Sequence, residues 1–180
     1  MVDTVDSDHL GQQMIDFMAR LFPINRSITG EGIRETFEIL RERIPLNIHH
    51  VPTGYEAFDW TVPQEWNVRD AWVKNDRGER VIDFQQSNVH LLGYSMPVSA
   101  NLTLNELRSH LHTLPEQADA IPYLTSYYEE RWGFCLSHKQ LEKMADGPYE
   151  VVVDTELKDG YLTFADLVLP GKSNREIFIF

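Results

Sequence analysis

The stretch YYEERWGFCLSH, residues 127–138, gathers four large aromatic side chains, the only cysteine of the chain, an arginine and a histidine. Alternation with a period of two places Trp132, Phe134 and Leu136 on one face of an extended segment, which is typical of a strand that lies against a core. Ser137 follows with the spacing of a helix cap. The stretch therefore predicts a strand that leads directly into a short helix.

Length and composition limit the classes of protein to consider. The chain has 180 residues, a net charge of −12 and 42% hydrophobic residues, which predicts one domain, or one domain with a small insertion, around a real core. The acidic balance argues against nucleic acid and against a membrane surface as partners, because both attract clustered Lys and Arg. A single cysteine excludes an intrachain disulfide and fits a reducing compartment. We expect a soluble, cytoplasmic protein.

Helices are expected where apolar residues recur at helical spacing. Two such segments cover 8–21 and 31–43, and Thr29 is placed to cap the second. Thr103 and Glu106 have the spacing of a capping box and predict a third helix. These segments alternate with strand-like runs along the chain.

Strands are expected where β-branched and aromatic residues cluster between turn residues. The predicted strands cover 46–52, 66–74, 80–84, 89–94, 149–155, 161–169 and 176–180. The turns at 75–78 and 158–160 predict two hairpins. The run at 176–180, EIFIF, is typical of a central strand that continues into a loop and a helix, so we expect this chain to be part of a longer protein.

The histidines and the cysteine do not predict a metal site. Cys135 and His138 form a lone C-x-x-H, and a structural zinc needs four ligands. A buried thiol is the favoured interpretation of Cys135, and a nucleophile paired with His138 is the alternative. His110 and His112 are better explained by their position near the end of a predicted helix, where positive charge is favourable.

The aromatic residues allow two interpretations. They could form a platform on which a sugar or another ring stacks, or they could fill the core of a small β-rich unit, which is the commoner role. The platform would use Trp60, Trp66, Trp72, Tyr123, Tyr127, Tyr128 and Trp132. The candidates for residues that face a pocket are Tyr127, Tyr128, Arg131, Trp132 and His138.

Four long stretches carry a resemblance to a known family. They are LFPINRSITGEGIRETFEIL (21–40), FDWTVPQEWNVRDAWV (58–73), LHTLPEQADAIPYLTSYYEERWGFCLSH (111–138) and LVLPGKSNREIFIF (167–180). Together they resemble the bacterial aminopeptidase-like proteins that are often encoded with surface-polysaccharide and natural-product genes. That family is similar to zinc-dependent exopeptidases and carries an inserted domain of unknown function.

The resemblance implies an architecture. The chain would be the N-terminal portion of a zinc-exopeptidase-like α/β fold that carries an inserted small α+β domain. Residues 1–55 would supply the first helices and strand of the peptidase-like domain, 56–149 the inserted domain, and 150–180 the return to the peptidase-like sheet. The inserted domain would shape access of substrate or form contacts in a homo-oligomer.

The resemblance also implies a chemistry and its location. In the full-length family a zinc ion would act on a small peptide or an aminoacylated substrate, but the zinc ligands of the family match no position in this sequence. We therefore assign no catalytic or metal residue here and expect no zinc in this chain alone. The alternative function is a non-catalytic module that binds a glycan or a peptide through the aromatic residues.

Overall fold

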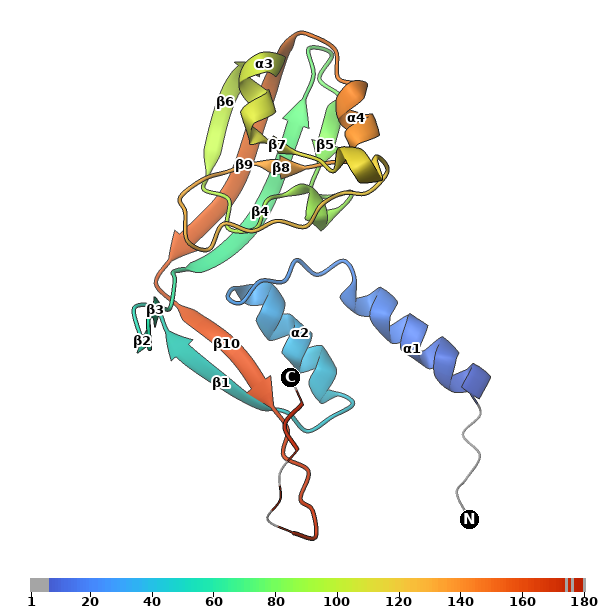
Figure 1. Ribbon diagram of the computed structural model, residues 1–180, viewed down its shortest axis with the longest axis vertical. Helices are drawn as coiled ribbons and strands as arrows, with labels where there is room; N and C mark the ends of the chain where they lie inside the picture. The colour runs from blue at the N-terminus through green and yellow to red at the C-terminus, as the bar shows by residue number, and fades with distance from the viewer. Residues whose placement is uncertain (1–6, 174, 176, 180) are drawn as a thin grey trace.

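A four-stranded antiparallel sheet in the order β5-β4-β9-β6 forms the upper part of the molecule in Figure 1. The computed structural model describes residues 7–173, 175 and 177–179. The strands of this sheet are β4 (Glu65–Lys74), β5 (Arg80–Asp83), β6 (Val98–Thr103) and β9 (Pro148–Lys158). The turn at 75–78 joins β4 to β5, so the first predicted hairpin is confirmed.

One face of the sheet carries the core. Val73 and Val151 are fully buried, as are Phe134 and Leu107 from the segments that cover them. Buried and more exposed side chains alternate along β9, which directs one set toward this cover, whereas in β4 the consecutive residues 71–73 are all buried. Burial of this apolar surface is the main source of stability for the upper part.

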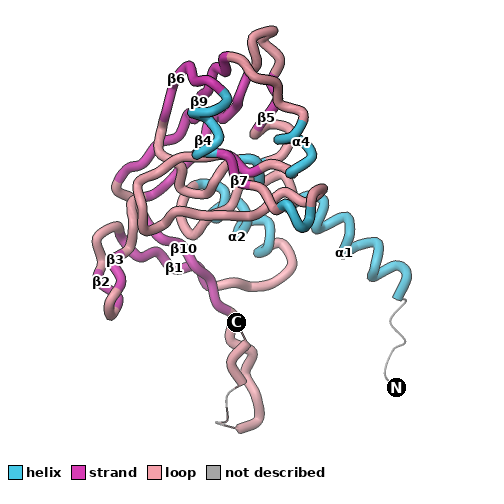
Figure 2. Tube along the Cα trace, turned by 45° about the horizontal axis from the view of Figure 1, so that its top comes forward, coloured by secondary structure: helices cyan, strands magenta, loops and turns pink. Residues whose placement is uncertain are grey.

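Short elements and long loops form the cover. They are α3 (Leu104–Leu107), three 3₁₀ turns (Asn88–His90, Arg108–His110 and Pro115–Gln117), β7 (Leu111–His112), β8 (Phe134–Cys135) and α4 (His138–Glu142). Figure 2 shows that much of the chain between β6 and β9 is loop. The predicted capping box at Thr103 and Glu106 is confirmed at the start of α3.

The lower part is a two-stranded antiparallel sheet with two helices (Figure 1). Strand β1 (Asn47–Pro52) pairs with β10 (Tyr161–Asp166), and α2 (Glu31–Arg41) contacts β10. Helix α1 (Ser7–Leu21) is joined to the end of α2 by the ion pair of Arg20 with Glu42. The small hairpin of β2 (Glu56–Ala57) and β3 (Trp60–Thr61) projects to one side.

The two parts are connected by the lower ends of β4 and β9. These strands pair from Lys74 opposite Glu150 down to Glu65 opposite Lys158, and β10 begins three residues after Lys158. Strand β9 therefore belongs to the upper sheet and β10 to the lower one. The predicted second hairpin is wrong, because the turn at 158–160 passes the chain from one sheet to the other instead of folding it back.

Three further expectations about elements are corrected. The stretch 127–138 is strand only at Phe134–Cys135, because single hydrogen bonds to separate segments, such as Leu92 N to Gly133 O, hold the rest. The segment 89–94 is not a strand but contains a 3₁₀ turn, and β6 was not predicted. In the C-terminal run, residues 177–179 form no strand, and residues 176 and 180 lie outside the described residues.

The start of α2 is also different from the expectation. Gly30 occupies the cap position and has no side chain to cap the helix, and the free N–H of Glu31 donates to the Asn67 amide oxygen, at 2.8 Å, instead of to Thr29. The Thr29 hydroxyl bonds instead to Tyr94 and to the backbone of Trp66. Among the helices of residues 7–173, none is both long and apolar enough to span a bilayer.

Candidate functional site

A buried ion pair holds the lower part against the first residue of β4. Glu65 is only 4% exposed, and its carboxylate accepts two hydrogen bonds from Arg34 on α2, at 2.7 and 2.9 Å. The backbone N–H of Tyr161 and the amide of Asn67 donate to the same carboxylate. Arg34, which also pairs with Glu31, is the main cause that lowers the pKa of Glu65 to about 2. The carboxylate is therefore ionised at neutral pH.

A second set of hydrogen bonds lies next to this ion pair. The Thr29 and Tyr94 hydroxyls are 2.6 Å apart, the backbone N–H of Trp66 donates to Thr29, and Tyr94 donates to the Gln64 carbonyl. Burial raises the pKa of Tyr94 to about 12, so its hydroxyl stays protonated. Tyr94 has a backbone φ of 64°, a conformation that costs energy for a residue with a side chain. The hydrogen bonds and the stacking of its ring on Trp66 hold it there.

Two glycines allow the backbone to come this close. A Cβ atom on Gly30, which has a φ of 92°, would lie 2.4 Å from the Trp66 carbonyl oxygen. A Cβ atom on Gly160 would lie 2.4 Å from a carboxylate oxygen of Glu65. We call Thr29, Gly30, Arg34, Glu65, Tyr94 and Gly160 the junction, because these residues join α2, β4 and the turn before β10.

The chemistry of the junction favours positioning over proton transfer. An open depression of about 630 Å³ lies beside it, lined by Glu31, Arg34, His50, Glu65, Asp159, Gly160 and Tyr161. A general acid or base works best with a pKa near the working pH, whereas Glu65 is ionised far below neutral pH. The ion pair therefore holds two parts of the fold together.

The structure places the five predicted pocket residues on the cover of the upper sheet. The Tyr127 ring lies edge-on to Tyr94, with 4.9 Å between ring centroids, and Tyr128, 81% exposed, lies edge-on to Tyr127. Trp132 stacks flat on the His110 ring, with 3.6 Å between centroids.

The other two predicted pocket residues have polar contacts. Arg131 is exposed and pairs loosely with Glu129, at 3.7 Å, and its guanidinium also reaches the Thr125 carbonyl. His138 begins α4, with its ring 3.1 Å from the Thr113 hydroxyl. The structure thus brings Tyr127 and Tyr128 together and puts Trp132 and His138 in separate contacts. That these five residues face a substrate stays a prediction.

The described residues contain no group of three or more His, Cys, Asp or Glu side chains that could hold a metal ion. Cys135 is fully buried, and burial raises the pKa of its thiol to about 11, so the thiol is protonated at neutral pH and is a poor nucleophile. His110 lies in a 3₁₀ turn and not near the end of a long helix. Burial, with Arg131 and His110 nearby, lowers the pKa of His112.

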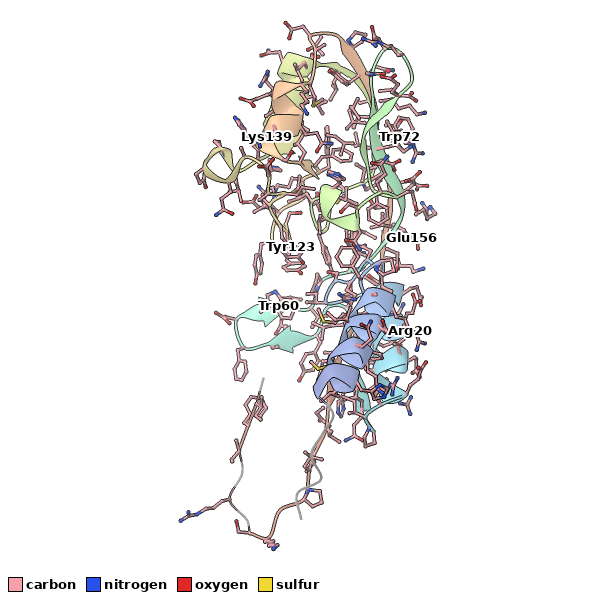
Figure 3. The ribbon with its side chains drawn as sticks, turned by 90° about the vertical axis from the view of Figure 1, so that its right-hand side faces the viewer. Arg20, Trp60, Trp72, Tyr123, Lys139 and Glu156 are labelled. Carbon is pink, nitrogen blue, oxygen red and sulfur yellow. The ribbon has the colours of Figure 1, made fainter. Side chains whose placement is uncertain are left out.

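The larger set of aromatic residues is divided between core and surface. Trp66 is in the core, and Trp72 is nearly covered, with the Lys74 ammonium 3.9 Å from its ring. Tyr123 is 68% exposed. Figure 3 shows Tyr123 and Trp60 on one side of the molecule, with Trp72 on the opposite side. These residues therefore do not form one continuous platform.

Few features of the sequence indicate the junction. Arg34 and Glu65 are 31 residues apart and lie in different elements, so no local spacing could pair them. Gly30 and Gly32 form a glycine-rich segment at the start of the helix predicted at 31–43, where helix capping is the ordinary explanation. The one available signal was a pair of glycines, Gly30 and Gly160, each next to a predicted element, since glycine often marks a close approach of backbone.

Comparison with known proteins gives two relatives. The chain is 48% identical over 174 residues to a protein of Clostridium acetobutylicum named for a polysaccharide biosynthesis role and an aminopeptidase-like domain. It also resembles the crystal structure, at 2.37 Å resolution, of a protein from the same species named as a candidate peptidase. That match has a TM-score of 0.85 and 51% identity and covers 89% of this chain. The chain spans 40% of the length of the first relative and 38% of the second.

These comparisons agree with the resemblance seen in the sequence at a coarse level. The mixed α/β architecture is that of a peptidase-like protein, and a match to part of a longer relative fits the expectation that the chain is an N-terminal portion. The limits expected for an inserted domain remain a prediction. A family model described as "Domain of unknown function (DUF2172)" matches residues 65–156, just over half of the chain. The chain therefore belongs to the DUF2172 family.

Proposed function

We propose that this chain is the scaffold portion of a zinc-dependent hydrolase that cleaves an amide or peptide bond. The observation that carries the proposal is the TM-score of 0.85, at 51% identity, to a protein named as a candidate peptidase. At this level of identity the two chains share their packing in detail. We expect the substrate to be a small peptide or an aminoacylated compound. The clostridial relative is named for polysaccharide biosynthesis, and we expect the substrate to belong to such a pathway.

The described residues do not fit a zinc site. A catalytic zinc needs about three protein ligands and an open position for water, and no such group is present among them. We propose that the 180-residue chain alone binds no stoichiometric zinc and cleaves no aminoacyl substrate, and that its role is to support the rest of a hydrolase.

A chimera tests this proposal. This chain replaces the matching segment of the clostridial relative, which it resembles at 48% identity, and hydrolysis of a set of aminoacyl amides is measured with and without a zinc chelator. We expect the chimera to retain hydrolysis that the chelator abolishes and added zinc restores. The isolated chain is the control, and metal analysis should find well below one zinc per chain.

Two results would contradict the proposal. One is hydrolysis by the chimera that a chelator does not reduce, which would exclude zinc. The other is one zinc per molecule in the isolated chain, which would place a metal site in the residues that we describe as scaffold. If neither the relative nor the chimera hydrolyses any amide, the enzymatic function itself is wrong.

The second candidate function is a non-catalytic module that binds a glycan or a peptide. The observation that favours it is that Tyr123 and Tyr128 expose most of their surface to solvent, although both rings are large and apolar. Single exposed aromatic residues are common, but exposed aromatics close together often mark a binding surface. A titration of tryptophan fluorescence with oligosaccharides separates this function from a purely structural role.

A further inference from the structure

A cleft of about 290 Å³ lies where the connection between α1 and α2 meets the cover of the upper sheet. Its lining consists of Phe22, Ile24, Asn25, Arg26, Ser27, Trp66, Asn88, Val89, Leu91, Gly93 and Tyr123. Trp66 is almost fully buried, and Tyr123 is mostly exposed at the rim. None of the five pocket residues expected from the sequence belongs to this lining.

Two buried hydroxyl groups at this cleft lack a hydrogen-bond partner. They are Ser27 Oγ and Thr125 Oγ1, and no other described side chain has a buried polar atom of this kind. Ser27 lines the cleft directly, and Thr125 pairs with Gly93, another lining residue. The Ser27 hydroxyl lowers the pKa of the nearby Tyr94 phenol as a hydrogen-bond donor would, but that phenol already bonds to Thr29 and Gln64, and Ser27 forms no hydrogen bond of normal geometry with it. Buried hydroxyls normally find a partner, so these two point to a polar molecule bound at the cleft.

The other lining residues restrict what that molecule can be. The lining contains no carboxylate, although the chain has a net charge of −12. The ammonium group of a peptide would therefore find no charged partner there. The only charged lining residue is Arg26, which donates one hydrogen bond to the Leu21 carbonyl. Asn25, Asn88 and the two hydroxyls instead offer neutral groups that can both donate and accept hydrogen bonds.

We propose that this cleft binds one saccharide ring. The ring would stack on Tyr123, whose flat apolar face suits the C–H face of a sugar, and its hydroxyls would bond to Ser27, Thr125 and the asparagine amides. The volume lies at the lower end of the range for small-molecule sites, which fits a single ring better than an extended peptide. This inference rests on the second of the two proposed functions and assigns it a site and a ligand class.

Saturation-transfer NMR on the 180-residue chain tests the proposal. The probes are the methyl glycosides of glucose, mannose, N-acetylglucosamine and glucuronic acid. We expect transfer from the protein to at least one glycoside, and a dissociation constant about tenfold larger for Tyr123→Ala, because the stacking surface is lost. Ser27→Ala should also weaken binding while leaving the melting temperature nearly unchanged, since it removes a hydroxyl that has no partner in the fold.

Tyr55→Ala is the matched control, because Tyr55 is also a mostly exposed tyrosine and does not line the cleft. The dissociation constant of Tyr55→Ala should equal that of the unmodified chain. Absence of transfer to all four glycosides would overturn the proposal, as would equal weakening by Tyr123→Ala and Tyr55→Ala. Transfer to alanyl-alanine amide in place of the glycosides would identify a peptide site instead. None of these results affects hydrolysis by the chimera. The proposed saccharide site and the proposed role as scaffold of a hydrolase can therefore fail independently of each other.

Discussion

At the scale of single residues, the energetics of Glu65 depend on its partners. A carboxylate with so little contact with water is costly to ionise unless it is paired and hydrogen-bonded. Here the Arg34 guanidinium, the Asn67 amide and the Tyr161 N–H all stabilise the charged form. Removal of one partner of such a pair leaves the other charge buried and uncompensated. This change destabilises the fold more than replacement of both partners by apolar residues.

The pKa of Glu65 makes part of the stability depend on pH. Its pKa is lowered from the ordinary value of 4.5 to about 2, so the folded state favours the ionised form. The contribution is present above about pH 4.5 and is lost as the pH falls toward 2, with a total of about 3 kcal/mol. Glu65→Gln should therefore remove that part of the acid dependence in urea-unfolding measurements between pH 4.5 and 2.

The matched control is Glu116→Gln, which neutralises an exposed carboxylate in the cover of the upper sheet. The difference between its unfolding free energy and that of the unmodified chain should stay constant over the same pH range. A Glu65→Gln difference that is also constant with pH would show that the ion pair is not formed in solution.

At the scale of elements, the junction depends on backbone contact. Gly30 and Gly54 both have positive φ angles, of 92° and 82°, but only Gly30 lies against another strand. Gly54→Ala should cost about 1–2 kcal/mol of unfolding free energy, from the left-handed conformation alone. Gly30→Ala should cost clearly more, because its Cβ would clash with the Trp66 carbonyl and move α2 away from β4. Equal costs in denaturant unfolding would mean that the close approach is not maintained.

Sequence patterns predicted those elements that are held by hydrogen bonds between residues close together in the chain. The helix at 31–43 is present as α2, and the hairpin around 75–78 is confirmed, because its turn is closed by bonds of Asn75 to residues 77 and 79. The second hairpin looked equally clear in sequence, yet the turn at 158–160 packs against Glu65 and the next strand joins another sheet. The contact between Gly160 and Glu65 and the pairing of β10 with β1, each between segments far apart in the chain, distinguish the two cases.

The aromatic stretch fails as a strand for a related reason. Phe134, Cys135 and Leu136 are all fully buried, whereas a strand with one solvent face would alternate. The burial arises because this segment is the part of the cover that packs into the core of the upper sheet, where β8 pairs with the two-residue strand β7 and Phe134 bridges to Leu91. Alternation of apolar and polar residues indicates a strand with one buried face, so this pattern could not predict a segment that is buried on all sides.

At the scale of the whole molecule, α1 exposes most of its apolar side chains to solvent. Leu10, Met14, Met18 and Phe22 recur every four residues, and all four are exposed, Met18 by 61% and Phe22 by 76%. Four apolar side chains at this spacing lie on one side of a helix and form a stripe. A stripe of this kind marks an interaction surface or a risk of association. The chain spans 40% of its clostridial relative, so the isolated chain lacks a counterpart of most of that protein. In the isolated chain the stripe is exposed and can contact other molecules.

We therefore expect the isolated chain to self-associate through α1 as its concentration rises. Met18→Glu places a charge in the middle of the stripe and should shift sedimentation-velocity profiles toward the monomer, since burial of an unpaired carboxylate in the contact is costly. Gln13→Glu adds the same charge to α1 outside the stripe and should leave the profile unchanged. A monomer at all concentrations, or equal effects of the two variants, would assign the stripe no role in association. In the chimera, where the remainder of the relative is present, Met18→Glu should instead lower the melting temperature if that remainder covers the stripe.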